Sequence, residues 1–229
     1  DPETGDRFQV NKNGHGTFVA DRGQFNVVLG IRQFGRTEPS APAKHRQYAS
    51  LTDIFPTIVS LLGDTPQKGG FDGMSLKSWI SSQDTDREVR RELFTESGFD
   101  RGKFGPGNTI SKKSLKKLVS SQISQYRITP LNHVVLKDEA VAGLMNEKQY
   151  AVIERERSVA ILPGPETIRV IGLDYGKRQW RPLYEDIRPD TKAGSLMGPD
   201  DPYTDLLATL MKRFAGDPVI RKIEKAMVP

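Results

Sequence analysis

The sequence predicts an α/β protein in which part of a helix-covered sheet is followed by a small antiparallel α+β subdomain. Residues 25–32, FNVVLGIR, form a nearly continuous apolar run, which is typical of a strand buried on both faces. Residues 50–62 carry large apolar side chains at helical spacing. Residues 150–185 hold four short β-rich runs separated by turn residues, and such a pattern predicts antiparallel hairpins.

The helix predicted over residues 50–62 has clear start and stop signals. Ser50 or Thr52 can serve as its N-cap, and Asp53 falls in the first turn, where a carboxylate favours the exposed N–H groups. Gly63 is suited to the position after the last turn. The apolar stripe is expected to face a core, and its members recur every four residues: Ile54, Ile58 and Leu62.

The remaining elements are predicted in chain order from periodicity and turn residues. Before residue 110 we expect a short helix at 75–80, a charged, solvated helix at 84–91 and a strand at 92–96. After it we expect helices at 111–124 and 138–148, extended segments at 126–129 and 133–136, the four strands, and terminal helices at 203–215 and 218–227. The predicted domains are residues 1–110, the α/β part, and residues 111–229, the α+β subdomain.

Composition narrows the class of protein. The chain is 36% hydrophobic and 28% charged with a net charge of +5, which indicates a folded, soluble composition and does not require a nucleic-acid partner. The absence of cysteine excludes disulfides, thiolate metal sites and a cysteine nucleophile within this chain. The sequence starts at Asp1 without a methionine. We therefore expect either a processed product or a piece of a longer protein, from which targeting or membrane segments have been removed.

No self-contained catalytic motif is present, and the candidate residues are few. His15 lies between glycines in NGHGTF, where the backbone can turn sharply and bring the imidazole close to an anionic ligand. A solvated turn is the alternative interpretation. Lys112, Lys113, Lys116 and Lys117 form a basic patch, which fits either a solvated face or contact with phosphate or lipid headgroups.

Three segments in a fixed order resemble the C-terminal part of the sulfatase-like branch of the alkaline-phosphatase superfamily. They are His15-Gly16 followed by NVVLGIR, then Asp53-Ile54-Phe55-Pro56-Thr57 through Gly63, then Asp72-Gly73-Met74-Ser75-Leu76. The strand with Leu93 to Gly98 continues the resemblance, which covers residues 12–98. Asp53, Pro56, Asp72 and Ser75 are expected to shape the backbone and not to take part in catalysis.

The resemblance implies a metal-dependent hydrolase of sulfate or phosphate esters. Its nucleophile and metal ligands are expected upstream of residue 1, since the family's early motifs are absent here. The divalent metal would be calcium, zinc or manganese, with none bound by this chain alone. From the resemblance we expect His15 to contact the ligand or donate a proton, and Lys12 to bind the substrate. The expected partners are an anionic ester and the missing N-terminal part of the same protein, in a periplasmic or other extracytoplasmic location.

Three alternatives stay open at this point. One is a membrane-anchored phosphoethanolamine or glycerophosphate transferase of the same superfamily, attached through segments absent from this chain. Another is a binding or regulatory domain that kept the fold and lost the chemistry. The third is a basic nucleic-acid-binding module, for which we expect only weak and non-specific binding.

Overall fold

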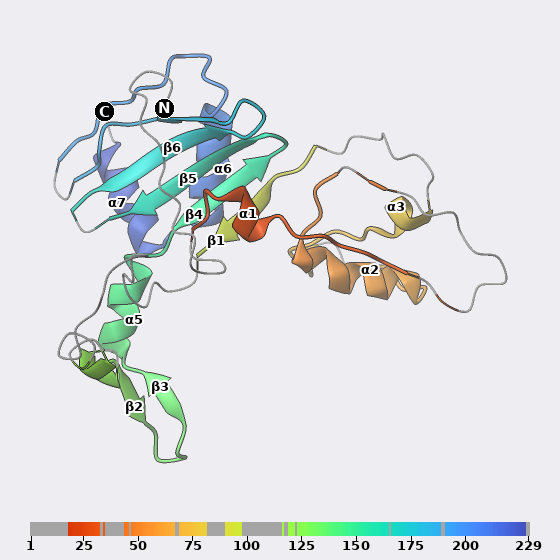
Figure 1. Ribbon diagram of the computed structural model, residues 1–229, viewed down its shortest axis with the longest axis horizontal. Coiled ribbons are helices and arrows are strands. Elements are labelled where there is room, and N and C mark those ends of the chain that lie inside the picture. The colour runs from red at the N-terminus through yellow and green to blue at the C-terminus, as the bar shows by residue number, and fades with distance from the viewer. Residues whose placement is uncertain are drawn as a thin grey trace. The chain divides into compact units, whose positions relative to one another are not determined.

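The computed structural model describes residues 18–32, 34, 44–45, 47–66, 69–81, 90–97, 116, 119–121, 123–164, 166–188 and 191–227 (Figure 1). The chain forms two compact units. The larger unit contains residues 1–26 and 94–229, and the smaller unit contains residues 27–93. The predicted domain boundary at residue 110 lies outside the described residues. The chain combines helices with antiparallel sheets, which agrees with the predicted mixed α/β class.

A five-stranded sheet with the order β1-β4-β5-β6-β7 is the centre of the larger unit. Its strands are β1 (Leu93–Glu96), β4 (Tyr150–Glu154), β5 (Arg157–Pro163), β6 (Ile168–Asp174) and β7 (Gln179–Pro182). From β4 to β7 each strand pairs antiparallel with the next. The predicted meander and the predicted strand at 92–96 are therefore confirmed.

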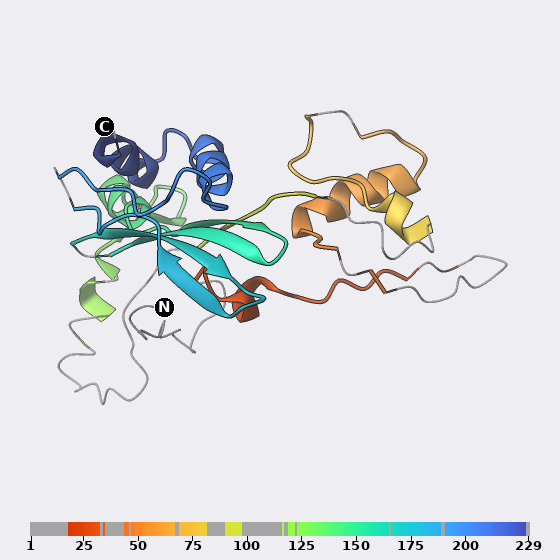
Figure 2. The same ribbon diagram turned by 90° about the horizontal axis from the view of Figure 1, so that it is seen from above.

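Helices α6 (Thr204–Arg213) and α7 (Pro218–Ala226) cover one face of this sheet (Figure 2). Asp217 accepts a hydrogen bond from the Val219 N–H and Pro218 occupies the first turn, so the predicted start of the last helix is confirmed. Asp217 also accepts a hydrogen bond from the Tyr150 hydroxyl at 2.5 Å. The core on this face contains Tyr150, Val152, Val159, Ile161, Val170, Leu210, Ile220 and Ile223.

The opposite face of the sheet carries Ala151 and Ala160 beside larger apolar side chains, and residues 18–20 pack against it just before helix α1 (Arg22–Phe25). The prediction of a buried strand at 25–32 is wrong. Residues 26–32 have no regular structure, and Val28 is 99% exposed. A β-rich sequence forms a strand only when a neighbouring strand completes its hydrogen bonds, and no described strand lies between residues 27 and 92.

A hairpin and a helix follow in the chain. Strands β2 (Tyr126–Ile128) and β3 (Val134–Leu136) pair antiparallel, and α5 spans Asp138–Met145, so the predicted extended segments and helix are confirmed. The described residues between 116 and 123 are helical, as predicted. Their apolar side chains Val119 and Ile123 are exposed.

The smaller unit contains the helix at the centre of the sequence resemblance. A 3-10 turn, η1 (Leu51–Asp53), leads into α2 (Ile54–Leu61), and α3 spans Lys77–Ser81. Ser50 is the N-cap, and Gly63 takes a φ of 96° after the last turn, as predicted.

The prediction that the apolar stripe of α2 faces a core is wrong for the described structure. Ile54, Ile58 and Leu62 are exposed, and the buried face is formed by Pro56, Thr57 and Ser60. Hydrogen bonds from the following turn to Asp53 and Thr57 hold this polar face inward. None of the described helices is long and apolar enough to cross a membrane.

Candidate functional site

His15 and Lys12, the candidate site residues, lie outside the described residues. The description begins at Phe18, three residues after His15. We call residues 18–25 the anchor segment, because they attach the chain that follows His15 to the five-stranded sheet.

Apolar packing holds the anchor segment on the sheet. Val19 and Ala20 are buried against the face that the helices leave uncovered. Two alanines of the sheet, Ala151 and Ala160, lie at the centre of that face and are completely buried. Side chains this small let another backbone approach the sheet closely. The contact is completed by Leu162, Ile171 and Leu173, with Phe18, Tyr175 and Trp180 at its margin.

Two long-range hydrogen bonds fix the backbone of the anchor segment. The Val19 N–H donates to Oε1 of Gln149 at 3.2 Å, and the Tyr175 hydroxyl donates to the Ala20 carbonyl at 3.4 Å. Gln149 is itself held by Ser97, because the Ser97 N–H donates to the Gln149 carbonyl and the Gln149 N–H donates to Ser97 Oγ, both at 3.0 Å. Ser97 is buried. The start of β4 and the end of β1 thus position the first described residues after His15.

The outer end of the anchor segment is held by charge and by aromatic contacts. Asp21 caps α1 by accepting from the Gly23 N–H at 2.9 Å. Arg22 forms an ion pair with Glu156 at 2.7 Å and lies over the Tyr175 ring. Phe25 meets the same ring edge to face at 6.1 Å. These contacts are half exposed, so we assign most of the attachment to the buried part around Val19.

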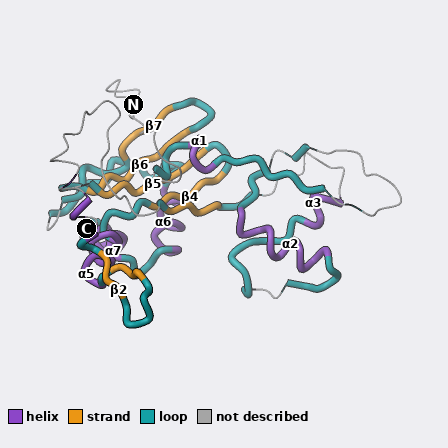
Figure 3. Tube along the Cα trace, turned by 60° about the horizontal axis from the view of Figure 1, so that its bottom comes forward, coloured by secondary structure: helices purple, strands orange, loops and turns teal. Residues whose placement is uncertain are grey.

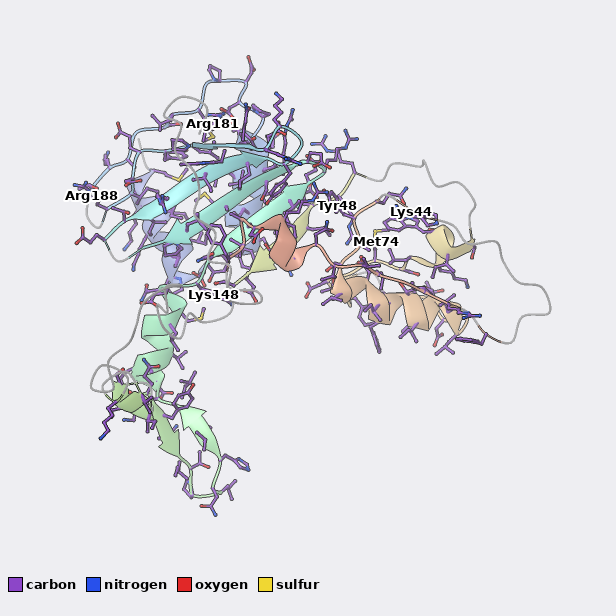
Figure 4. All side chains as sticks on the ribbon, in the orientation of Figure 1. Lys44, Tyr48, Met74, Lys148, Arg181 and Arg188 are labelled. Carbon is purple, nitrogen blue, oxygen red and sulfur yellow. The ribbon has the colours of Figure 1, made fainter. Side chains whose placement is uncertain are left out.

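The smaller unit contains a buried charged group, which we call the Asp53 cluster. Asp53 is fully buried, and its carboxylate accepts from the backbone N–H groups of Ser50 at 2.7 Å and Met74 at 2.8 Å (Met74 is labelled in Figure 4). Arg91 donates to both carboxylate oxygens, at 2.7 and 3.0 Å. Thr57 Oγ1 donates to the Asp53 carbonyl and accepts from the Leu76 N–H.

The electrostatics of this cluster are those of a satisfied structural ion pair. Burial by itself would raise the pKa of Asp53, but the hydrogen bonds from Arg91, Ser50 and Met74 and the Arg91 charge outweigh it. The pKa of Asp53 is therefore held below its ordinary value, and the carboxylate stays ionised at neutral pH. All of its lone pairs point at donors of the same unit. This supports the expected structural role of Asp53.

Gly73 shows how closely the turn after α2 lies against the helix start. A Cβ at this position would come within 2.1 Å of the Thr52 carbonyl oxygen and 2.6 Å of the Asp53 nitrogen. Only glycine fits such an approach. The Asp72-Gly73-Met74-Ser75 turn is therefore seated on the residues that begin the helix, and the second and third segments of the sequence resemblance form one structural element.

Sequence reasoning missed several of these residues. Arg91 was expected in a solvated helix, but residues 90–91 are not helical and the Arg91 side chain is only 15% exposed. Residues 84–89 of that predicted helix lie outside the described residues. Gln149, Ser97 and Tyr175 carry no local pattern that distinguishes them from other polar surface residues. Their partners lie 52 to 155 positions away in the chain.

Among the residues that the structure describes, no cluster of three or more histidine, aspartate or glutamate side chains could hold a metal ion. The basic patch is represented there by Lys116 alone, which is exposed. Comparison with known proteins gives no match to a protein-family model, a curated protein or a solved structure.

Proposed function

We propose that this chain is part of a metal-dependent sulfatase-like hydrolase, with the alkaline-phosphatase type of α/β fold, that acts on sulfate or phosphate esters. In this proposal the nucleophile and the ligands of a calcium, zinc or manganese ion belong to a part of the protein outside these 229 residues. His15 contacts the ester or protonates the leaving group, and Lys12 binds the anionic substrate. An extracytoplasmic location belongs to the same proposal.

The apolar surface of the smaller unit is the observation that carries this proposal. Five large apolar side chains of α2 and its C-cap are 39–82% exposed: Ile54, Phe55, Ile58, Leu61 and Leu62. The apolar segment 27–31 is exposed in the same unit. An amphipathic helix and a β-rich segment normally bury such faces against other elements of one domain. This supports an α/β layer whose covering elements are supplied from elsewhere in the protein.

The proposed reaction class is based on the order and spacing of the three sequence segments that resemble the family. The described contacts explain why particular residues are needed in the second and third segments. The Asp53 cluster gives a structural reason for the aspartate, the threonine and the glycine of the second and third segments. The packing of the anchor segment on the sheet explains the residues that follow His15-Gly16 of the first segment. A metal ion, when bound, would activate the nucleophile and offset charge on the ester oxygens. The residues of this chain would bind the ester and supply a proton.

The proposal is tested on the longer protein that it implies. We expect metal-dependent hydrolysis of aryl sulfate or aryl phosphate esters by that protein and no turnover by the 229-residue chain alone. His15→Ala should lower kcat by a factor of about 10² or more, as expected for loss of a general acid. His133→Ala is the matched control, since His133 is exposed on the hairpin.

Two results would contradict the proposal. One is metal-dependent turnover by the 229-residue chain alone, because the nucleophile and metal would then have to be held by it. The other is an unchanged kcat in the His15→Ala protein with wild-type circular dichroism, which would remove His15 from the site. A longer protein that lacks both a nucleophile and metal ligands would instead favour a binding or regulatory role.

A further inference from the structure

The loop between β2 and β3 forms a short, regular hairpin tip (Figure 3). The Thr129 N–H donates to the His133 carbonyl at 2.8 Å, and the Asn132 N–H donates to the Thr129 carbonyl at 2.9 Å. Asn132 takes a φ of 59°, the left-handed conformation that closes a three-residue hairpin loop. The hydrogen bonds fix which side chains stand at the apex.

Three aliphatic side chains are exposed at this apex, and we call them the apolar tip. Ile128 is 72% exposed, Leu131 is 76% exposed and Val134 is 67% exposed. Ile128 and Val134 are directly opposite each other in the antiparallel pair, so their side chains leave the same face of the hairpin. Leu131 stands in the loop between them. Such a contiguous exposed cluster is costly in water and indicates a binding surface.

The chain around the apolar tip is strongly basic. Between residues 101 and 137 there are eight lysine or arginine residues and no acidic ones, while the net charge of the whole chain is only +5. The positive charge of the protein is therefore concentrated in this stretch. Of these residues Lys116, Arg127 and Lys137 are described, and all three are exposed. Arg127 is next to Ile128 on β2, and Lys137 follows β3, three residues from Val134, where its N–H donates to the Gln125 carbonyl. The alternation of a strand places the Arg127 side chain on the opposite face of the hairpin from Ile128 and Val134.

We propose that this hairpin docks on the surface of an anionic lipid bilayer, with the apolar tip inserted among the acyl chains and the basic side chains at the phosphates. The free energy of aliphatic side chains falls when they enter the boundary of the hydrocarbon region, and the negative surface potential attracts lysine and arginine side chains. Single-stranded nucleic acid is a poorer match, because its recognition uses aromatic side chains that stack on bases. The inference does not depend on the proposed hydrolase function.

The test is co-sedimentation of the 229-residue chain with vesicles of phosphatidylcholine alone and of phosphatidylcholine with phosphatidylglycerol. We expect binding only to the anionic vesicles, weaker at high salt. Lys137→Gln should reduce the partition coefficient about fivefold. Leu131→Ser should also reduce it about fivefold, through lost apolar transfer. The matched controls outside the hairpin are Lys177→Gln and Leu196→Ser, both at exposed positions, and these should bind as the unchanged chain does.

Each result decides for or against the hairpin. Equal binding to both vesicle types, or no binding to either, overturns the proposal. Losses of the same size in the Lys177→Gln and Leu196→Ser controls also overturn it, because the contact would then be spread over the surface. A chain that binds a single-stranded oligonucleotide but not anionic vesicles would show that the basic stretch serves nucleic acid. Circular dichroism confirms that the variants are folded.

Discussion

Arg91→Met should destabilise the smaller unit far more than a surface substitution does. The change removes the guanidinium that donates to both oxygens of Asp53 while keeping an apolar stem of similar length. Asp53 has no exposed surface, so water cannot replace the lost donors without opening the unit. The carboxylate would be left buried with only the Ser50 and Met74 N–H groups.

The magnitude follows from two independent estimates. Two charge-assisted hydrogen bonds are worth about 1.5–3 kcal/mol each, and removing one partner of a buried ion pair costs about 3–5 kcal/mol. A unit of 67 residues, Val27 to Leu93, has a typical total stability of about 3–10 kcal/mol. We therefore expect Arg91→Met to remove about a third or more of the free energy of unfolding of this unit.

The two tryptophans let each unit be followed separately. Trp79 belongs to the smaller unit and Trp180 to the larger one. In a Trp180→Phe background, urea unfolding monitored by fluorescence reports the smaller unit. In a Trp79→Phe background it reports the larger unit. Arg91→Met should shift the first transition and leave the second unchanged.

A shift below about 1 kcal/mol in the Trp79 transition would refute the assigned role of the ion pair. Arg90→Met is the matched control, because Arg90 is exposed and a surface pair is worth at most about 1 kcal/mol. The double variant Asp53→Asn with Arg91→Met should be more stable than the sum of the single effects predicts. The reason is that removing both charges leaves no buried, unpaired one.

Four further predictions use the same fluorescence assay. Gly73→Ala should destabilise the smaller unit by about 1–3 kcal/mol through its clash with the backbone of η1, whereas Gly30→Ala, with nothing within 4 Å, should not. Ile58→Asp should change the stability of the 229-residue chain by less than about 1 kcal/mol because this side chain is exposed. In the longer protein of the proposed function the same change should cost several kcal/mol, because the carboxylate would be buried under a covering element. Equal effects in both proteins would argue against a covering element. Asp217→Ala should destabilise the larger unit by about 2–3 kcal/mol, since it removes the α7 cap and the acceptor of the Tyr150 hydroxyl. Because the pKa of Asp53 is lowered on folding, its contribution is complete above about pH 4 and is lost as the pH falls towards the folded pKa; Asp53→Asn should remove this acid sensitivity in a series of unfolding curves.

Local signals predicted the parts of the fold whose stabilising contacts are near in sequence. The hairpins of β4 to β7 follow from alternation and turn residues, and α7 follows from Asp217-Pro218. The prediction of a strand at residues 25–32 was wrong because a strand depends on partners that can be distant in the sequence. Its apolar run specifies a buried strand only if a neighbouring strand is present, and none of the described residues provides one. The residues of this segment favour a strand, but the described chain does not form one there.

The α2 stripe shows the same limit for helices. Periodicity located the helix and its ends correctly, but it could not say which face is covered. The buried face is decided by polar contacts, from Met74 to Asp53 and from Leu76 to Thr57. For the candidate site, the sequence indicated His15 and Lys12 from a motif, whereas the residues that hold the anchor segment had no detectable signal. Gln149 acts through a partner 130 positions away.

The long separation between the anchor segment and the sheet has a consequence for how the protein assembles during synthesis. Val19 leaves the ribosome before Gln149, its hydrogen-bond acceptor, which is made 130 residues later. At typical synthesis rates of about 5–20 residues per second, the interval is roughly 7–26 s. Contacts between such distant positions also form slowly because the chain between them must be closed into a loop. The anchor segment can thus be attached only after Gln149 and Tyr175 have been made, which makes the positioning of Val19 and Ala20 a late event of folding.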